Sequence, residues 1–343
     1  MKPLNKSLRV CFFAGVKDKD LLDLMQWYKE DIQILKELGF EVAIATNWRE
    51  IPWNAALYFA WWPTKGILPL IKAKIMRKPI IIVAGGSEVV RQRDLKYGFS
   101  NSSIIKRAII IFCLKHTDRI LSISDAATKE ILALVPNCKV ETVYLSVDTA
   151  TFTPNDNDKK NIIFTISHLN RENIHRKRIK EIIKAIPYVV KDFPEVKFVI
   201  AGRKLEGFEE LEYEVERLSI QKFVSFPGKI SNDEKVEYFR KSLIYLQPTL
   251  HEGFGLAIAE AMSCGVPVIT TKVGAVPEVV DEAGIYVNPN EPLEIANAIK
   301  ELLSNSEKRK KLGRLARERI VNKFSFDIRK RKILEIIQEV LGK

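Results

Sequence analysis

The sequence predicts an α/β protein made of two doubly wound domains, each built around a parallel β-sheet. Short apolar runs rich in β-branched residues alternate with longer amphipathic segments, which is typical of βαβ units. The alternation stops at one polar interruption and then starts again. The length of 343 residues also favours two hydrophobic cores over one. We therefore expect two domains of similar architecture.

The first round of alternation predicts a first domain over residues 1–150. Its expected elements are, in order, strand Val10–Ala14, helix Leu21–Leu38, strand Val42–Thr46, strand Ile80–Ala84, helix Ile104–His116 and strand Ile120–Ile123. Apolar runs of this continuous kind suit strands that are covered by helices on both faces of a parallel sheet.

The second round predicts a second domain over residues 151–326. A polar segment with Pro154, about 148–161, is expected to be the linker. The expected strands are Ile162–Ser167, Phe198–Ala201, Leu243–Leu246, Val268–Thr270 and Ile285–Val287. Ser231 with Glu234 predicts a capping box, and Asn290 before Pro292 predicts another helix start. The last helical pattern, about 327–343, suits either domain and could pack back on the first.

Composition excludes several classes of protein. Hydrophobic residues make up 46% and charged residues 29% of the chain, which predicts a folded protein throughout. The longest apolar runs, such as Ala108–Leu114, are far shorter than the roughly 20 residues of a membrane span. With no signal-peptide pattern either, we expect a cytoplasmic protein, with a peripheral place at the inner face of the membrane as an open alternative.

No metal or other cofactor is expected. The four cysteines lack C-x-x-C spacing, and the four histidines lack ligand spacing. D-x-D occurs at Asp18–Asp20 and Asp156–Asp158, but both lie in polar connecting segments, which argues against metal sites.

The net charge of +12 is concentrated in the first domain. Residues 72–119 hold 11 Lys or Arg against 3 Asp or Glu. This excess fits either a solvated surface or an anionic partner, and the lack of any nucleic-acid-binding motif excludes DNA and RNA. We hypothesise an anionic or lipid-linked partner at a membrane surface. The cations are Lys72, Lys74, Arg77, Lys78, Arg91, Arg93 and Lys96, and the aromatic residues that suit either the interface or the core are Trp53, Tyr58, Trp61 and Trp62.

The stretch from Pro248 to Val280 carries most of the chemistry. A strand ends near Gln247, and a glycine-containing loop leads into a helix that opens at about Gly255. Ligands of open α/β sheets bind at the carboxyl ends of strands, and a helix N-terminus favours phosphate. The dinucleotide fingerprint is incomplete, because Ile258 stands at its third glycine position, so a dehydrogenase is not expected.

Two carboxylates lie at the ends of an eight-residue step in this stretch, Glu252 before the glycines and Glu260 inside an apolar helix. A buried carboxylate needs a partner, such as ligand hydroxyls. The context EGFGLAIAEAMSCGVPVI resembles the E-x7-E signature of the retaining glycosyltransferases of family 4. The resemblance implies the GT-B fold, with two Rossmann-like domains facing a cleft, a nucleotide-sugar donor and a hydroxyl acceptor.

The same resemblance implies roles for individual residues. Glu260 would bind the donor ribose, and Glu252 would lie by the transferred sugar. The backbone of Gly253, Phe254, Gly255 and Leu256 would meet phosphate and sugar oxygens. Gly274 and Glu278 also match the family and are expected to shape their loop.

A basic segment, RENIHRKR, follows the first strand of the second domain. By the resemblance, Lys177 would hold the donor pyrophosphate together with a guanidinium. The sequence has Ser167, His168 and Leu169 where the family commonly reads Gly-Arg-Leu, so either Arg171 or Arg176 would supply that guanidinium, or it is missing.

The first domain is less explicit. Gly85 and Gly86 follow one strand and Gly15 follows another, which places these glycines like the family's acceptor-side loops. No catalytic residue is identified there. Two alternatives to sugar transfer remain open at this stage: a nucleotide-sugar epimerase of the same architecture, and a non-catalytic nucleotide-sugar binding module.

Overall fold

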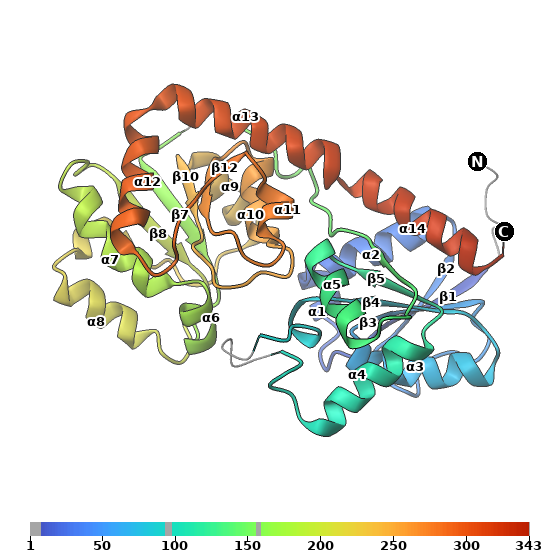
Figure 1. Cartoon of the computed structure of the whole chain (residues 1–343). Coiled ribbons are helices and arrows are strands. Elements are labelled where there is room, and N and C mark those ends of the chain that lie inside the picture. Colours follow the sequence, from blue (N-terminus) through green and yellow to red (C-terminus); the bar gives the residue numbers. More distant parts are fainter. Residues whose placement is uncertain (1–7, 93–97, 156–158, 343) are drawn as a thin grey trace. The chain divides into compact units, whose positions relative to one another are not determined.

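The structure, a computed structural model, describes residues 8–92, 98–155 and 159–342 (Figure 1). It divides into two compact units, and each is described by itself. Unit 1 comprises Met1–Ser146 and Phe326–Lys343, and unit 2 comprises Val147–Ser325. The cations Arg93 and Lys96 and the second D-x-D, Asp156–Asp158, lie outside the described residues.

Unit 1 contains a six-stranded parallel sheet in the order β2-β1-β3-β4-β5-β6. The strands are β1 (Arg9–Ala14), β2 (Glu41–Ala45), β3 (Leu57–Trp61), β4 (Ile80–Ala84), β5 (Arg119–Ser122) and β6 (Val140–Thr142). Four of these strands are predicted by the sequence pattern, whereas β3 and β6 are not. In β3 every residue is buried, so the run LYFAW shows no alternation.

The helices of unit 1 are α1 (Leu21–Leu24), α2 (Gln26–Glu37), α3 (Pro63–Ile75), α4 (Ile104–His116), α5 (Asp125–Leu134), α14 (Phe326–Val340) and the 3₁₀ turn η1 (Gly86–Glu88). The single helix expected over Leu21–Leu38 is divided, because Met25 is extended between α1 and α2. The amphipathic pattern continues across the break, and the pattern alone does not locate it.

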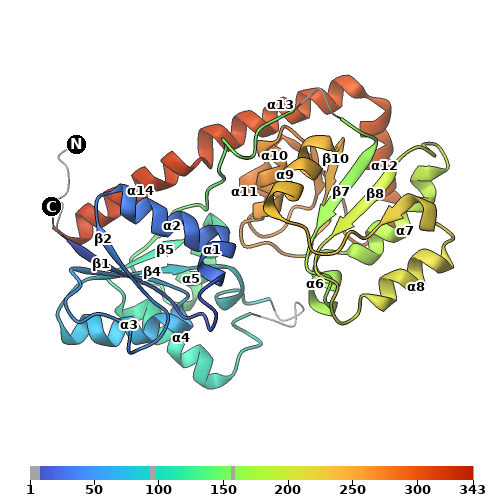
Figure 2. The ribbon, with the colours of Figure 1, turned by 180° about the vertical axis from the view of Figure 1, so that it is seen from behind.

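The C-terminal helix α14 packs on unit 1 beside α2, as both views show (Figures 1 and 2). Asp31 in α2 is fully buried and accepts two hydrogen bonds from the Arg329 guanidinium, at 2.8 and 2.9 Å. Trp61 Nε1 also donates to Asp31 Oδ2. The third nitrogen of Arg329, Nη1, donates to the carbonyls of Val143 and Tyr144. This bidentate pair fixes α14 to the sheet.

The boundary between the units falls before the expected polar linker. Val147 donates its backbone N–H to Phe324 O at 2.8 Å and pairs with Ser325. The first part of the expected linker is bound to unit 2, because Arg317 donates to the carbonyls of Thr149 and Phe152.

Unit 2 contains a second parallel sheet, in the order β12-β11-β10-β7-β8-β9. Its strands are β7 (Ile162–Ile166), β8 (Lys197–Ala201), β9 (Val224–Ser225), β10 (Ile244–Leu246), β11 (Val268–Thr270) and β12 (Gly284–Tyr286). From the centre of the sheet, β7, β8 and β9 follow one another toward one edge, and β10, β11 and β12 follow one another toward the other edge. The order therefore reverses between β7 and β10, which is where open α/β sheets bind ligands.

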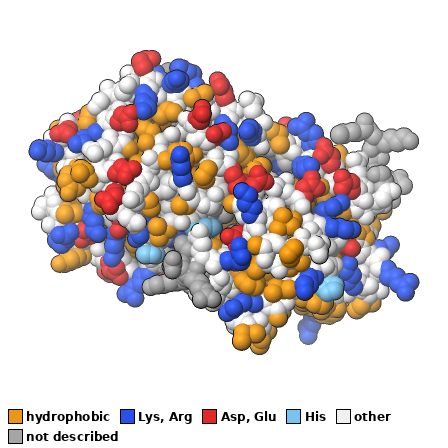
Figure 3. Space-filling model, in the orientation of Figure 1, with side chains coloured by type: hydrophobic (Ala, Val, Ile, Leu, Met, Phe, Trp, Pro, Cys, Tyr) orange, Lys and Arg blue, Asp and Glu red, His pale blue; other side chains and the backbone are white. Residues whose placement is uncertain are grey.

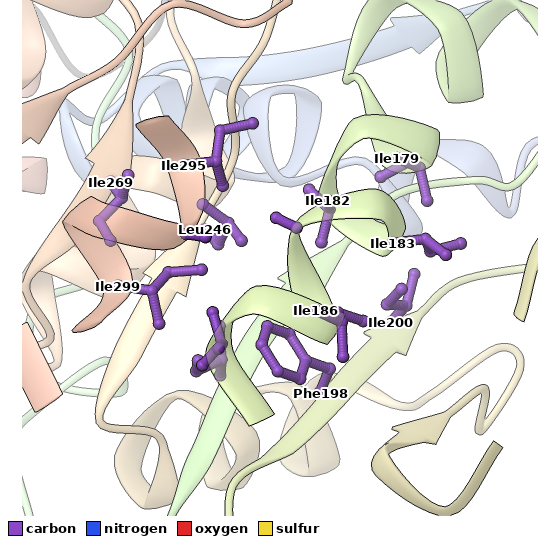
Figure 4. Close-up of a cluster of buried hydrophobic side chains, with 14 of the residues drawn as sticks. Ile179, Ile182, Ile183, Ile186, Phe198, Ile200, Leu246, Ile269, Ile295 and Ile299 are labelled. Atoms are coloured by element: carbon purple, nitrogen blue, oxygen red, sulfur yellow. The ribbon is translucent and has the colours of Figure 1, made fainter. Parts of the chain in front are cut away.

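Helices cover this sheet. They are α6 (Arg171–Arg176), α7 (Ile179–Val190), α8 (Glu209–Arg217), α9 (Asn232–Lys241), α10 (Leu256–Ser263), α11 (Val276–Val280), α12 (Pro292–Ser304) and α13 (Ser306–Lys323), with the 3₁₀ turn η4 (Gln221–Phe223). Isoleucines of α7 and α12 meet Phe198, Ile200, Leu246 and Ile269 of the strands in one core (Figure 4). The capping box of Ser231 and Glu234 is present.

Candidate active site

The end of β7 positions a lysine at the reversal point of the second sheet. Lys177 follows α6, and Arg178 adopts a left-handed conformation with φ 52° before α7 begins. The short helix α6 and the longer helix α7 thus meet at a sharp turn. Lys177 Nζ donates to the carbonyl of Ile166, at the end of β7, and to Gln247 Oε1, just after β10, at 3.4 and 3.2 Å. The ammonium group therefore connects the ends of β7 and β10, the two strands between which the strand order reverses.

Glu252 lies beside this lysine. Its Oε1 accepts hydrogen bonds from Arg176 Nη1 and from Gln247 Nε2, both at 2.9 Å, and lies 3.8 Å from Lys177 Nζ. Tyr245 donates its hydroxyl to Gln247 Oε1 at 2.6 Å. We call Arg176, Lys177, Gln247 and Glu252 the basic–acidic cluster.

Charge controls the ionisation of this cluster. Burial raises the pKa of the Glu252 carboxyl, but the charges of Arg176 and Lys177 lower it by more, so the pKa is below its ordinary value. Burial lowers the pKa of the Lys177 ammonium to about 8, although Glu252 acts in the opposite direction. The cluster thus holds two cations around one carboxylate. Its net positive charge suits an anionic ligand.

Gly274 holds the backbone of Glu252 in place. Gly274 has φ 51°, and a Cβ atom there would lie 2.3 Å from Glu252 O. The next residue, Ala275, donates its N–H to the same oxygen at 3.0 Å. Only glycine allows both this conformation and this close approach.

Glu260 is buried on α10, with 5% of its surface exposed. Its Oε1 accepts from Lys235 Nζ of α9 at 2.7 Å. Ligand hydroxyls were the partner expected for this carboxylate, and the structure adds Lys235, which the sequence did not indicate. Lys235 lies in a helix with alternating charges, so its own sequence carried no signal.

The glycine loop leads into α10 as expected. Gly255 has φ 92° and precedes the first helical residue, Leu256. Gly253 lies in the bend before it. Phe254 is buried, and its ring packs against Phe324 with centroids 5.6 Å apart. The Phe254 side chain therefore fixes the loop, and its backbone remains the part suited to ligand contact.

The two arginines that the sequence left as alternatives lie apart. Arg176 joins Glu252, whereas Arg171 Nε lies 3.3 Å from Glu210 Oε1 on α8 and its side chain is 74% exposed. Arg171 is not part of the basic–acidic cluster. Gln247 was missed as a member, although its position directly after β10 was the available signal.

The glycines of unit 1 have packing reasons of their own. A Cβ atom on Gly85 would lie 2.4 Å from Ile123 Cγ1, and one on Gly15 would lie 2.9 Å from Lys65. Gly86 has φ 56° and opens η1. These residues follow β4 and β1.

The basic region of unit 1 differs from the expected surface at one cation. Lys72 is buried, where its Nζ lies 4.5 and 4.4 Å from the rings of Trp48 and Trp53 and donates to the carbonyl of Ile51. Tyr58 and Trp61 are also buried.

Within the described ranges, no three His, Cys, Asp or Glu residues are placed to hold a metal ion. In the first D-x-D, Asp18 Oδ1 accepts from the backbone N–H of Asp20. Among the helices of the described residues, none is long and apolar enough to cross a membrane.

Comparison with known proteins gives the family. The profile of "Glycosyl transferases group 1" matches residues 147–319, about half of the chain. A phosphatidylinositol N-acetylglucosaminyltransferase subunit of Arabidopsis thaliana is 28% identical over 279 residues, which cover 74% of this chain and 61% of that protein. N-acetyl-alpha-D-glucosaminyl L-malate synthase of Bacillus anthracis is 29% identical over 225 residues, which cover 63% of this chain and 58% of that protein. The chain thus spans little more than half the length of these two relatives.

Solved structures share the fold over nearly the whole chain. HepE from Anabaena in complex with UDP and glucose has a TM-score of 0.76 and 17% identity, covering 96% of this chain and 99% of that one. Sucrose-phosphate synthase from Thermosynechococcus elongatus has a TM-score of 0.79 and 15% identity, covering 98% and 99%. With two parallel six-stranded sheets and a family profile that spans nearly all of unit 2, the chain has the GT-B fold and belongs to the family of group 1 glycosyl transferases.

Proposed function

We propose that this protein transfers a sugar, with retention of configuration, from a nucleotide-diphosphate sugar to an acceptor hydroxyl. The observation that carries the proposal is the basic–acidic cluster at the reversal point of the second sheet. Its two cations, Arg176 and Lys177, are held by one carboxylate, Glu252, in the position where such sheets bind ligands. Family membership supports the same conclusion.

In this proposal the donor binds to unit 2. Lys177 and Arg176 bind its pyrophosphate and stabilise the negative charge that develops as the nucleotide leaves. The backbone N–H groups at the start of α10, around Gly255 and Leu256, bind phosphate or sugar oxygens. Glu260, oriented by Lys235, accepts hydrogen bonds from the ribose hydroxyls.

Glu252 lies by the transferred sugar in this proposal. It holds Arg176 in position while remaining charged, because both cations lower its pKa. The donor phosphate, stabilised by Lys177, assists attack by the acceptor hydroxyl on the same face of the sugar that the nucleotide leaves. The proton of the acceptor goes to that leaving phosphate.

We also propose that unit 1 binds the acceptor, through the loops at Gly15, Gly85 and Gly86, and that the acceptor is anionic or lipid-linked. The excess of Lys and Arg over residues 72–119 supports this. The inositol-lipid name of the Arabidopsis relative makes a lipid-linked hydroxyl the first acceptor to test, and the same name makes a nucleotide-diphosphate N-acetylglucosamine the first donor to test.

The experiment is a panel of nucleotide sugars, assayed for release of free nucleotide with and without candidate acceptors. Acceptor-dependent release supports transfer. An altered nucleotide sugar without release of nucleotide would instead identify an epimerase, and binding without any turnover would identify a binding module. Lys177→Ala is the inactive control, and Arg171→Ala, which changes a cation outside the cluster, is the matched active control.

A further inference from the structure

The outer face of α4 is apolar, although solvent reaches it. Ile104 is 81% exposed, Ile105 is 74% exposed and Phe112 is 46% exposed. Ile104, Ala108 and Phe112 recur every four residues and therefore form one stripe along the helix. The opposite side, with Ile110, is buried against the unit. A helix that is apolar on both faces is ordinarily buried on both, so the outer stripe needs a cover.

Exposed apolar side chains also lie on the neighbouring helix. Helices α3 and α4 connect consecutive strands on the same side of the sheet and pack against each other (Figure 1). On α3, Ile71 and Ile75 are exposed and lie one turn apart, and Met76 follows. We call these residues the α3–α4 face; its members are Ile71, Ile75, Met76, Ile104, Ile105 and Phe112. Hydrophobic side chains gather at the lower edge of Figure 3, over α4, with Lys and Arg side chains beside them.

The charges on these two helices have one sign. Together α3 and α4 contain six Lys or Arg residues and no Asp or Glu. One of the six, Lys72, is buried and makes no part of the surface. Two copies of the chain that met through this face would bring like charges together, which disfavours self-association. A partner with an anionic surface and an apolar interior would neutralise the cations of these helices and cover the apolar stripe of α4.

A cationic pocket lies where α3 ends. Its volume is about 440 Å³, and its lining includes five cations and two carboxylates: Lys74, Arg77, Lys78, Arg119, Lys139, Asp118 and Glu339. The carboxylates pair with Lys74 and Arg119, which leaves an excess of positive charge. Arg119 Nε is buried without a hydrogen-bond partner. These features suit an anionic headgroup at the edge of the α3–α4 face.

We propose that the α3–α4 face docks on an anionic lipid bilayer, with the start of α4 entering the headgroup region and the pocket receiving a lipid phosphate. This deepens the proposed lipid-linked acceptor by naming the surface of unit 1 that meets the membrane. Burial of apolar side chains in the interface adds to the attraction between lysines and anionic lipid. The test of membrane docking does not depend on sugar transfer, because vesicle binding needs neither donor nor acceptor.

The test is sedimentation of the full chain with vesicles of phosphatidylcholine, alone or in equal parts with phosphatidylglycerol, at low and high salt. We expect binding to the anionic vesicles that weakens with salt. The double variant Ile104→Asn, Ile105→Asn should lower the partition coefficient by about tenfold or more, because two large side chains lose their burial. Leu293→Asn, at an exposed apolar residue of α12, is the matched control and should bind like wild type.

The outcomes separate the alternatives. Because Ile104 and Ile105 are exposed, the double variant should have the melting temperature of wild type. Phe112→Ser is a second variant of the same face and should also weaken vesicle binding. Equal binding of wild type and the double variant would overturn the proposal, as would a dimer without lipid that the double variant abolishes. Arg77→Glu with Lys78→Glu should weaken anionic binding, whereas free inorganic phosphate that competes with the vesicles would locate the phosphate site in the pocket. If the wild-type protein binds anionic vesicles but releases no nucleotide in the transfer assay, the proposed sugar transfer is contradicted and the proposed membrane docking is not.

Discussion

The guanidinium of Arg176 donates a hydrogen bond to Glu252 Oε1 across 2.9 Å, although 76 positions separate the two residues in the chain. Arg176 ends α6, which follows β7, and Glu252 lies in the loop after β10. The pair therefore joins the two strands at which the sheet order reverses. Its backbone is joined as well, because Leu250 donates its N–H to Arg176 O at 2.7 Å.

Removing this arginine tests its role against a nearby arginine. Arg176→Ala should lower kcat/KM on the order of 10²-fold or more, because the proposed mechanism loses one charge-assisted contact to the leaving phosphate and Glu252 loses its hydrogen bond from Arg176. Arg171→Ala should leave kcat/KM within a factor of about two, because an exposed ion pair contributes little. Steady-state kinetics on both variants make the comparison. Equal losses would show that the two arginines have been assigned incorrectly.

The depressed pKa of Lys177 predicts a fall in activity at alkaline pH. Its pKa of about 8 means that the free enzyme loses this charge as the pH rises through that value, so kcat/KM should decrease above about pH 8. Lys177→Arg should lack this decrease, since the guanidinium stays charged. Glu252→Gln should move the decrease to lower pH, because Glu252 raises the pKa of Lys177. A profile that is the same in all three proteins would exclude Lys177 as the titrating group.

Glu260 should contribute to donor affinity. Glu260→Gln keeps the shape of the side chain but should weaken the proposed hydrogen bonds to the ribose hydroxyls, at a cost of about 2 kcal/mol, or about 30-fold in Kd. Titration calorimetry with the nucleotide alone measures this. Unchanged affinity in a folded variant would remove Glu260 from the donor site. Lys235→Met distinguishes the orienting role of Lys235 from direct ligand contact by Glu260, because the variant keeps the Glu260 carboxylate but removes its hydrogen bond from Lys235.

Gly274 should be needed for the position of Glu252. Gly274→Ala places a Cβ atom 2.3 Å from Glu252 O at a positive φ, and we expect a loss of stability of about 1–3 kcal/mol together with reduced turnover. Gly228→Ala is the matched control: its φ is 79°, and nothing lies within 4 Å of the added Cβ. It should cost about 1 kcal/mol and keep turnover. Urea unfolding and kinetics on both variants would reveal whether the contact or the backbone angle matters.

The buried pair of Asp31 and Arg329 should dominate the docking of α14. Arg329→Met leaves a fully buried carboxylate with Trp61 as its remaining hydrogen-bond donor, and we expect a loss of about 3–5 kcal/mol in the free energy of unfolding. Asp31→Leu combined with Arg329→Met should recover part of this loss, because no charge then remains buried. Chemical denaturation followed by circular dichroism gives both values. A single variant as stable as wild type would contradict the assignment.

Local patterns predicted more of this molecule than long-range contacts did. The carboxylates Glu252 and Glu260 stand within nine consecutive residues, and the helix that carries Glu260 begins directly after Gly255, so their spacing was readable from the chain. Lys235 and Gln247 were not, because each meets its partner only after separate βα units have packed. The choice between Arg171 and Arg176 was open for the same reason. Arg171 and Arg176 lie at the two ends of α6, and the position of this helix determines which of them reaches Glu252. The hydrophobic periodicity of the sequence does not fix a helix boundary to within one turn.

The pairing of Asp31 with Arg329 also sets an order of events during synthesis of the chain. The ribosome makes the carboxylate 298 residues before the guanidinium, and the whole of unit 2 is made in between. At typical translation rates the wait is roughly 15 to 60 s, during which unit 2 can fold while unit 1 still lacks its last helix. Until α14 emerges, the nascent unit 1 must keep Asp31 in water or bury it without its cation. The first unit to be made is thus the last to be finished, and it is the one that a chaperone would have most time to meet.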